Sequence, residues 1–169
     1  MFIVVCVGQT NLDHIKAVQW GRTHENEGIK ALESYLGKKV TMTGIWLSKS
    51  GMLGASPDGF VEDSVVEVKC RYKSRQTILS EDLADDDSYI IRFNKISNVW
   101  IVNEKHDYFH QIQGQIHITN TQGCYLVVWT PGETAVVYIE KKAGWSEWLK
   151  KMEFFFVNKF VPYLKESLK

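Results

Sequence analysis

The stretch ASPDGFVEDSVVEVKC, residues 55–70, decides the fold. Its Pro-Asp-Gly triplet at 57–59 is a turn signal, because proline presets one backbone angle and glycine adopts angles that other residues avoid. The valine-rich run Val61–Cys70 that follows predicts a strand. Side chains alternate along a strand, so Glu67 and Lys69 share one face, about 7 Å apart along the chain. The stretch therefore predicts a turn leading into a strand that bears a carboxylate and an amine.

Periodicity outward from this strand predicts one α/β domain, residues 1–169, with a central mixed sheet flanked by helices. The expected strands cover Phe2–Val7, Val40–Leu47, Met52–Ser56, Val61–Cys70, Tyr89–Phe93, Asn98–Val102, Cys124–Trp129 and Thr134–Ile139. The expected helices cover Asn11–Trp20, a segment from an N-cap at Thr23 to Leu36, Glu104–Thr119 and Ala143–Val161. Gly37 fits a left-handed C-cap, Pro162 ends or kinks the last helix, and the acidic run Glu81–Asp87 is expected in a solvated loop.

Composition narrows the classes of protein. The 169 residues are 44% apolar, enough to bury a core without disulfides. Twenty basic and twenty acidic residues give a net charge of zero, which excludes a polycationic tail but not nucleic-acid binding, since local patches decide that. Three cysteines without a CxxC pair predict reduced thiols and an intracellular protein. The apolar run at residues 2–7 is too short to span a membrane.

Several acidic residues stand in places where each alone has an ordinary explanation. Glu25 shares an apolar helix stripe with positions 29, 32 and 36, yet a glutamate near a helix N-terminus is also favoured by the helix dipole. Asp58 alone is a turn residue, and Glu67 with Lys69 alone is a surface ion pair. Taken together, they predict carboxylates that converge from neighbouring segments.

Converging carboxylates repel one another and favour a hard divalent cation such as Mg²⁺ or Mn²⁺. A lysine beside that cation can hold and polarise an attacking water and stabilise charge on a pentavalent phosphate. This set of groups is typical of metal-assisted phosphodiester hydrolysis.

Four segments in order give the chain a family resemblance. They are Trp20-Gly21 with Glu25-Asn26, Ala55–Gly59, Glu67–Cys70 and Tyr108–Gln113. With them the sequence resembles the PD-(D/E)xK nuclease superfamily, and within it the lambda-exonuclease branch of YqaJ-like viral recombinases. The resemblance implies a restriction-endonuclease-like core and a deoxyribonuclease that hydrolyses DNA from double-stranded ends during recombination.

The resemblance also implies a metal site with two Mg²⁺ or Mn²⁺ ions. Asp58 and Glu67 would be the principal ligands, and the backbone carbonyl of Val68 would supply a further oxygen. Glu25 would reach the site through water or through the second ion. Gly28 would let the helix that carries Glu25 approach the sheet closely.

Other matched positions would act on water and DNA. Lys69 would orient or activate the hydrolytic water, and Gln111 would position the nucleophile or the scissile phosphate. The residues expected to contact DNA are Arg71, Lys73 and Arg75, which follow the strand, and Ser56 before the turn.

Relatives form ring-shaped trimers that thread duplex DNA and work beside strand-annealing proteins, which makes these the expected partners; no membrane association is expected. The chain departs from the family pattern in two places: Arg71 stands where a proline is common, and the stretch Gln76–Asp107 is longer. About twenty residues precede the acidic helix, so no counterpart of the family's terminal-phosphate pocket is expected.

Two alternatives remain open on the sequence. One is a structure-selective endonuclease or an RNA-cutting relative on the same fold. The other is a DNA-binding or assembly module that has kept the fold without the activity.

Overall fold

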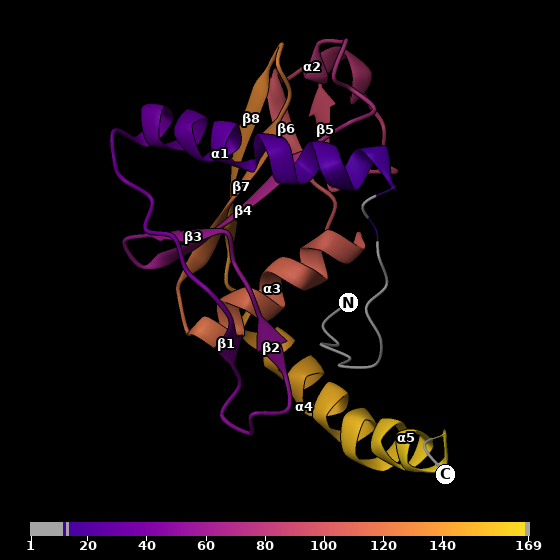
Figure 1. Ribbon diagram of the computed structural model, residues 1–169. Helices are drawn as coiled ribbons and strands as arrows, with labels where there is room; N and C mark the ends of the chain where they lie inside the picture. Colours follow the sequence, from indigo (N-terminus) through magenta and orange to yellow (C-terminus); the bar gives the residue numbers. More distant parts are fainter. Residues whose placement is uncertain (1–11, 13, 168–169) are drawn as a thin grey trace.

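The structure is a computed structural model that describes residues 12 and 14–167 (Figure 1). Its strands are β1 (Trp46–Leu47), β2 (Gly54–Ala55), β3 (Gly59–Val61), β4 (Ser64–Cys70), β5 (Ile91–Asn94), β6 (Val99–Val102), β7 (Gly123–Trp129) and β8 (Thr134–Glu140). Its helices are α1 (Lys16–Leu36), α2 (Leu79–Asp82), α3 (Asp107–Thr119), α4 (Ser146–Phe155) and α5 (Val161–Ser167). A 3-10 turn, η1 (Ala143–Trp145), precedes α4, and a π-helical turn, η2 (Phe156–Phe160), joins α4 to α5.

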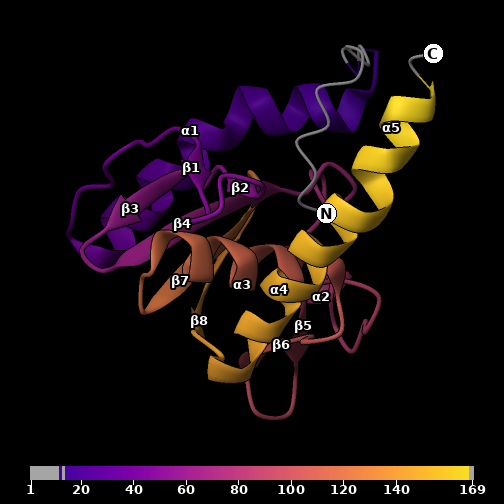
Figure 2. The same cartoon turned by 90° about the horizontal axis from the view of Figure 1, so that it is seen from below.

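The central sheet has the strand order β3-β4-β7-β8. Strands β4 and β7 are parallel and pair over seven residues, while β3 and β8 are antiparallel to their neighbours. Helix α1 packs on one face of the sheet and α3 on the other (Figure 2). The predicted fold class, α/β with a central mixed sheet flanked by helices, is confirmed.

Alternation along β4 divides the core into two clusters. Val65 packs with the α3 residues Ile112 and Ile116 in one cluster, and all three are fully buried. Val66 and Val68 belong to the second cluster, with Ile29 and Leu32 of α1. Both faces of β4 are therefore covered, as expected for a central strand that pairs in parallel.

Helix α1 is one helix where the sequence predicted two. The N-cap predicted at Thr23 is wrong, because Thr23 lies inside the helix and its Oγ1 donates to the carbonyl of Gln19 at 2.8 Å. A threonine hydroxyl bonded four residues back satisfies itself without ending the helix. The C-cap at Gly37 is confirmed, with φ of 65°.

The segment between α1 and β3 contains less strand than expected. Of the predicted strand Val40–Leu47, only β1 and an isolated bridge between Thr41 and Phe60 are present. The predicted strand Met52–Ser56 is confirmed in its centre as β2, which pairs antiparallel with β1. Because β1 and β2 pair only with each other, over two residues each, most of this segment lies outside the central sheet.

The two strands expected between β4 and α3 are present as β5 and β6, which pair antiparallel as a hairpin. The acidic run was expected to be a solvated loop, but its first residues form α2, and Asp82 pairs with Arg71. Three other members, Glu81, Asp85 and Asp87, are exposed. The predicted solvated loop is thus wrong for Glu81 and Asp82, which are helical, and right for Asp85 and Asp87.

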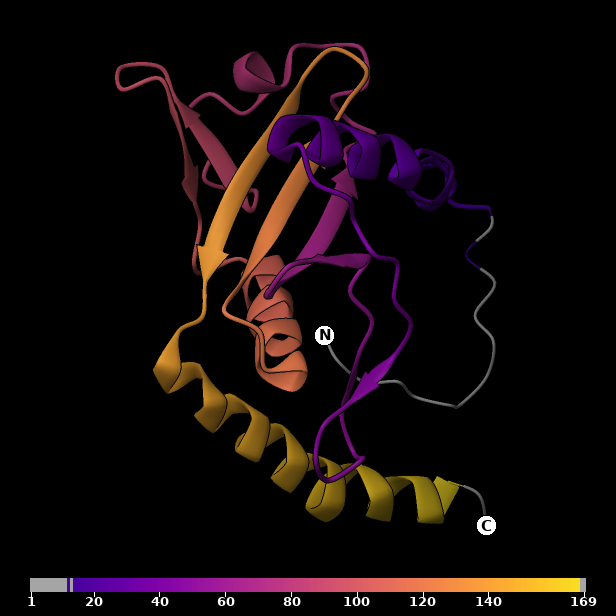
Figure 3. The ribbon, with the colours of Figure 1, turned by 90° about the vertical axis from the view of Figure 1, so that its left-hand side faces the viewer.

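The C-terminal helices run along one end of the molecule beside β1 and β2 (Figure 3). Ser50 hydrogen-bonds to Glu153 of α4 and ties the two parts together. The helical path continues through Pro162, which was expected to end or kink it. In the π-helical turn before that proline, the amide of Val161 bonds to the carbonyl of Phe156, five residues back. The wider turn accommodates a residue that lacks an amide hydrogen.

Some predictions fall on residues that the structure leaves out. The predicted strand Phe2–Val7, the thiol of Cys6 and the start of the predicted helix at Asn11 lie outside the described residues. Over residues 14–167, none of the helices combines the length and apolar character that a membrane span needs.

Gly28 lies where α1 crosses β4, and the predicted close approach is confirmed. A Cβ added at Gly28 would lie 2.4 Å from Cγ1 of Val68. At Gly21 in the same helix, a Cβ would meet no heavy atom within 4 Å.

We expect Gly28→Ala to lower the melting temperature of the protein. Alanine favours a helix by about 1 kcal/mol over glycine, but overpacking against the stiff Val68 side chain costs about 1–3 kcal/mol. Gly21→Ala is the matched control and should raise the melting temperature, since the propensity gain meets no contact. Thermal unfolding followed by circular dichroism measures both, and equal stabilisation by the two variants would contradict the close packing.

Candidate active site on strand β4

The turn that carries Asp58 is fixed to β4 by its backbone and its side chain. The amide of Asp58 donates to the carbonyl of Val66 at 3.0 Å, and Oδ2 of Asp58 accepts from the amide of Val68 at 2.7 Å. Amide and carbonyl of one strand residue point to the same side. The Val68 carbonyl therefore faces the edge of β4 that Asp58 occupies, and two of the predicted metal ligands lie together.

Glu67 is buried on the opposite side of β4 from Val66 and Val68, at 3% exposure. Nε2 of Gln111 donates to its Oε1 at 2.9 Å, and Nε2 of Gln115 donates to its Oε2 at 2.7 Å. Lys69 forms a hydrogen-bonded ion pair with the same Oε1. A buried carboxylate needs such partners, and α3 with β4 supplies them on both oxygens.

Lys69 lies between Glu67 and an aromatic ring of α3. Its Nζ is 4.3 Å from the centroid of the Tyr108 ring. Burial disfavours the charge of Lys69, but the charge and the hydrogen bond of Glu67 outweigh it and raise the pKa of the amine. Lys69 is therefore a cation at neutral pH, held between Glu67 and Tyr108.

Asp58 carries the electrostatic strain of the site. Burial and then the charge of Glu67 raise the pKa of the Asp58 carboxyl to about 7, and the charge of Glu25 acts in the same direction. The amide of Val68 opposes this by bonding to the ionised form. The three carboxylates predicted to converge thus do interact, although they come from a turn, a strand and a helix.

A cavity of about 490 Å³ opens beside these groups, between α1, the end of β4 and the segment that follows it. It is lined by Ala17, Gly21, Arg22, Glu25, Val68, Lys69, Cys70, Arg71, Tyr72, Lys73, Tyr89 and Tyr108. Glu25 and Lys69 reach it from opposite sides of the sheet. Of the three carboxylates, only that of Glu25 lines the cavity; Asp58 and Glu67 lie behind its wall, where their neighbours Val68 and Lys69 line it.

The donor set fits a divalent cation. Among the described residues, no three His, Cys, Asp or Glu side chains are grouped closely enough to hold an ion by themselves. Two carboxylates and the Val68 carbonyl are a partial shell of hard oxygens, which is how Mg²⁺ binds when it keeps several waters. Burial, and after it the charge of Glu67, raises the pKa of Asp58, and a cation beside the two carboxylates would favour their ionised forms.

The residues predicted to contact DNA occupy different places. Arg71 and Lys73 line the cavity, but the side chain of Arg71 is largely buried, at 11% exposure. Arg75 instead donates to the carbonyl of Tyr72 at 2.8 Å and stacks on its ring at 3.9 Å. Ser56 is exposed beside the turn.

Gln115 is the residue of the site that the sequence analysis missed. It follows Gln111 by four positions, which places both amides on one face of α3. The side chain is 1% exposed, and its Oε1 has no hydrogen-bond partner among the described residues. The four-residue spacing of Gln111 and Gln115 is a signal that both lie on one face of the helix. It points to the site only when that face is known to meet Glu67.

A comparison with protein-family models matches residues 3–122 to the YqaJ-like viral recombinase domain. The chain belongs to this family. The match includes every carboxylate of the site and ends just before β7. No curated protein sequence gives a significant match.

Solved structures share the fold of this YqaJ-like domain. An alkaline exonuclease from Laribacter hongkongensis is 21% identical, with a TM-score of 0.68 over 90% of this chain and 74% of that one. The same enzyme in complex with dAMP superposes equally well. A phage-related exonuclease from Haemophilus somnus is 12% identical, with a TM-score of 0.65 over 96% of this chain and 76% of that one.

Replacing Gln115 tests its role as a positioning residue for Glu67. Gln115→Met keeps the volume but removes a charge-assisted hydrogen bond, whose loss from a buried acceptor costs about 1–3 kcal/mol. We expect a several-fold higher metal concentration for half-maximal activity, because Glu67 is held less firmly.

Gln113→Met is the matched control for this measurement. Gln113 is also buried on α3, but it bonds to the backbone of Glu140 and Lys142 and not to Glu67. It should lower stability without changing the metal requirement. The same metal requirement in both variants would remove Gln115 from the site.

The electrostatic strain at Asp58 predicts a pH-dependent stability. Because folding raises the pKa of this carboxyl, the metal-free protein should lose stability as pH rises from about 4 to 7, where the folded state must release a proton that the unfolded state has already lost. Asp58→Asn should therefore raise the melting temperature in EDTA at pH 8 by about 3 °C or more, and much less at pH 4. The exposed Asp63→Asn is the control, and a lower melting temperature for Asp58→Asn at pH 8 would contradict the strain.

Proposed function

We propose that this YqaJ-like protein is a divalent-metal-dependent deoxyribonuclease that acts as an exonuclease on double-stranded DNA ends in recombination. The observation that supports it best is the meeting of Asp58, Glu67 and Lys69 at one end of β4, beside a cavity. Two carboxylates, a fixed cation and room for a substrate are what phosphodiester hydrolysis with a bound metal requires. The similar structures are those of an alkaline exonuclease and a phage-related exonuclease, which agrees with this proposal.

The residues divide the chemistry among them. When bound, Mg²⁺ or Mn²⁺ supplies Lewis-acid polarisation of the phosphate and lowers the pKa of water. Asp58, Glu67 and the Val68 carbonyl would hold the principal ion, and Glu25 would contribute through water or a second ion. Gln111 and Gln115 keep Glu67 in one orientation, so that its oxygens are fixed before the substrate arrives.

Lys69 is a cation beside the proposed metal ligands. It would orient or activate the attacking water and offset the negative charge that develops on the phosphate. The face of Tyr108 and the carboxylate of Glu67 hold the amine in place. The four cationic side chains of the cavity, Arg22, Lys69, Arg71 and Lys73, favour a polyanion such as DNA.

Assembly and location follow from the family resemblance alone. A homotrimer around duplex DNA and a strand-annealing partner are the arrangement that this function would use. An intracellular location agrees with the free thiols of Cys70 and Cys124.

Digestion of linear duplex DNA with and without EDTA tests the function. We expect metal-dependent release of nucleotides from the ends, with Asp58→Ala and Lys69→Ala each slowing turnover about a hundredfold or more, since each removes a principal transition-state contact. Lys95→Ala, in an exposed turn, is the control and should leave the rate unchanged.

Covalently closed circular DNA separates the possible nucleases. An exonuclease leaves the circle intact, whereas cutting of the circle would replace the proposal with an endonuclease. Unchanged digestion of linear DNA by both active-site variants would overturn the assignment of the site.

A further inference from the structure

The pairing of β4 with β7 continues one step beyond the strand. The amide of Arg71 donates to the carbonyl of Trp129 at 3.2 Å, so the extended backbone reaches residue 71. Side chains alternate with a period of two, which places Glu67, Lys69 and Arg71 on the same face. Arg71 is thus the next side chain after Lys69 in the row that carries the proposed chemistry.

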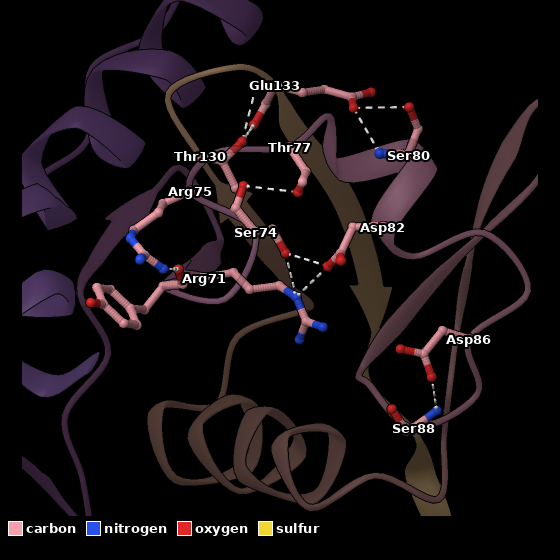
Figure 4. Close-up of polar contacts among 11 residues, drawn as sticks. Arg71, Ser74, Arg75, Thr77, Ser80, Asp82, Asp86, Ser88, Thr130 and Glu133 are labelled. Carbon is pink, nitrogen blue, oxygen red and sulfur yellow. Dashed lines mark hydrogen bonds and ion pairs between the residues drawn. The ribbon is translucent and has the colours of Figure 1, made fainter. Parts of the chain in front are cut away.

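The guanidinium of Arg71 is held in one orientation. Its Nε donates to Oγ of Ser74 at 2.6 Å and to Oδ2 of Asp82 at 3.3 Å (Figure 4). Its carbon lies 4.2 Å from the centroid of the Tyr89 ring. Ser74 is fully buried and also donates to Asp82, and these hydrogen bonds lower the pKa of Asp82 so that it stays ionised.

These two hydrogen bonds use Nε of Arg71 and not its terminal nitrogens. Both Ser74 and Asp82 bond to Nε, and the two terminal nitrogens of Arg71 point away from them in Figure 4. Arg71 is one of the residues that line the cavity. The side chain of Tyr89 also hydrogen-bonds to this guanidinium, and the donors that it leaves unused are presented with little further loss of freedom.

The charge of the cavity complements an anion. Four cationic side chains line it against a single carboxylate, that of Glu25. Three tyrosines, Tyr72, Tyr89 and Tyr108, complete the polar part of the wall. Arg71 pairs with Asp82, and Lys69 pairs with Glu67, so these ion pairs fix two of the cations in the wall of the cavity.

We propose that Arg71 is a preorganised phosphate-binding residue, which with Lys73 receives the DNA phosphate next to the one that is cleaved. Ser74, Asp82 and Tyr89 are its positioning residues. This gives the long segment after β4 a role, because α2 and the start of the β5–β6 hairpin bring Asp82 and Tyr89 to the arginine. The inference rests on the proposed function, since it takes DNA as the ligand of the cavity.

Binding of a short fluorescent DNA duplex, measured by anisotropy in Ca²⁺ over a range of salt concentrations, tests the subsite. Arg71→Gln should weaken binding about tenfold or more, as expected for a lost bidentate phosphate contact. The slope of log Kd against log salt should fall by about one. Gel analysis of the duplex after each titration checks that it is intact.

Arg92→Gln is the matched control. Arg92 pairs with Asp85 and Asp87 in the same segment but does not line the cavity, so the variant makes the same charge change. It should bind DNA within about twofold of the original chain with an unchanged salt slope. Equal affinities for Arg71→Gln and the original chain, or equal losses in the two variants, would overturn the proposal.

Two further variants separate binding from folding. Arg71→Lys keeps the charge but not the planar fork, and Asp82→Asn keeps the shape of the anchor but not its charge; both should retain the salt slope and bind several-fold more weakly. Melting temperatures identify any variant that has unfolded, and if Arg71→Gln has done so these two decide. Original affinity in both would overturn the proposal.

The same preparations distinguish the two inferences. If linear DNA is digested normally while Arg71→Gln binds it unchanged, the nuclease stands and the subsite fails. If the original chain binds DNA through Arg71 but releases no nucleotides in Mg²⁺ or Mn²⁺, the subsite stands and the nuclease fails.

Discussion

A buried carboxylate on the central strand constrains the structure around it. Glu67 is 3% exposed, and an isolated charge at such a depth would be very costly. Two amides of α3 and the amine of Lys69 bond to its oxygens, so the position and rotation of α3 are tied to one side chain of β4. The helix packs on the sheet through its isoleucines, but its register against the strand matters because the glutamines must reach Glu67.

The other face of the same strand positions the remaining acid. Val66 and Val68 pack against α1, which comes close because Gly28 has no side chain to hold it away. That approach brings Glu25 to the wall of the cavity that Lys69 also lines. The alternation of β4 thus directs Val66 and Val68 toward α1 and directs Val65, Glu67 and Lys69 toward α3, and residues of both helices line the cavity at the end of the strand.

The site was predictable as far as local rules reach. The turn at Asp58 and the shared face of Glu67 and Lys69 follow from turn chemistry and a period of two, both of which depend on neighbours in the sequence. Gln115 was missed because its role depends on where a helix lands on a strand 48 positions away. Thr23 was misread as a helix N-cap because a threonine hydroxyl can either cap the start of a helix or bond to the carbonyl four residues back within one. Both are short-range patterns, and the sequence alone does not distinguish them. The burial of Arg71 depends on the later segment that carries Asp82, which no short-range pattern specifies.

Although the net charge of the chain is zero, opposite charges are separated along β4. Toward the turn, Asp58 and Glu67 repel each other strongly enough that burial and mutual charge raise the pKa of Asp58 to about 7, and this end favours a cation. Two and four residues after Glu67, on the same face, come Lys69 and Arg71, and the second lies about 13 Å from Glu67 along an extended strand. Asp82 fixes the basic end, while at the acidic end Lys69 pairs with Glu67 and Asp58 keeps a raised pKa. A chain of phosphates that shares a divalent cation with Asp58 and Glu67 would complement both the acidic and the basic end of this row. A single monovalent cation or anion would complement only one of them.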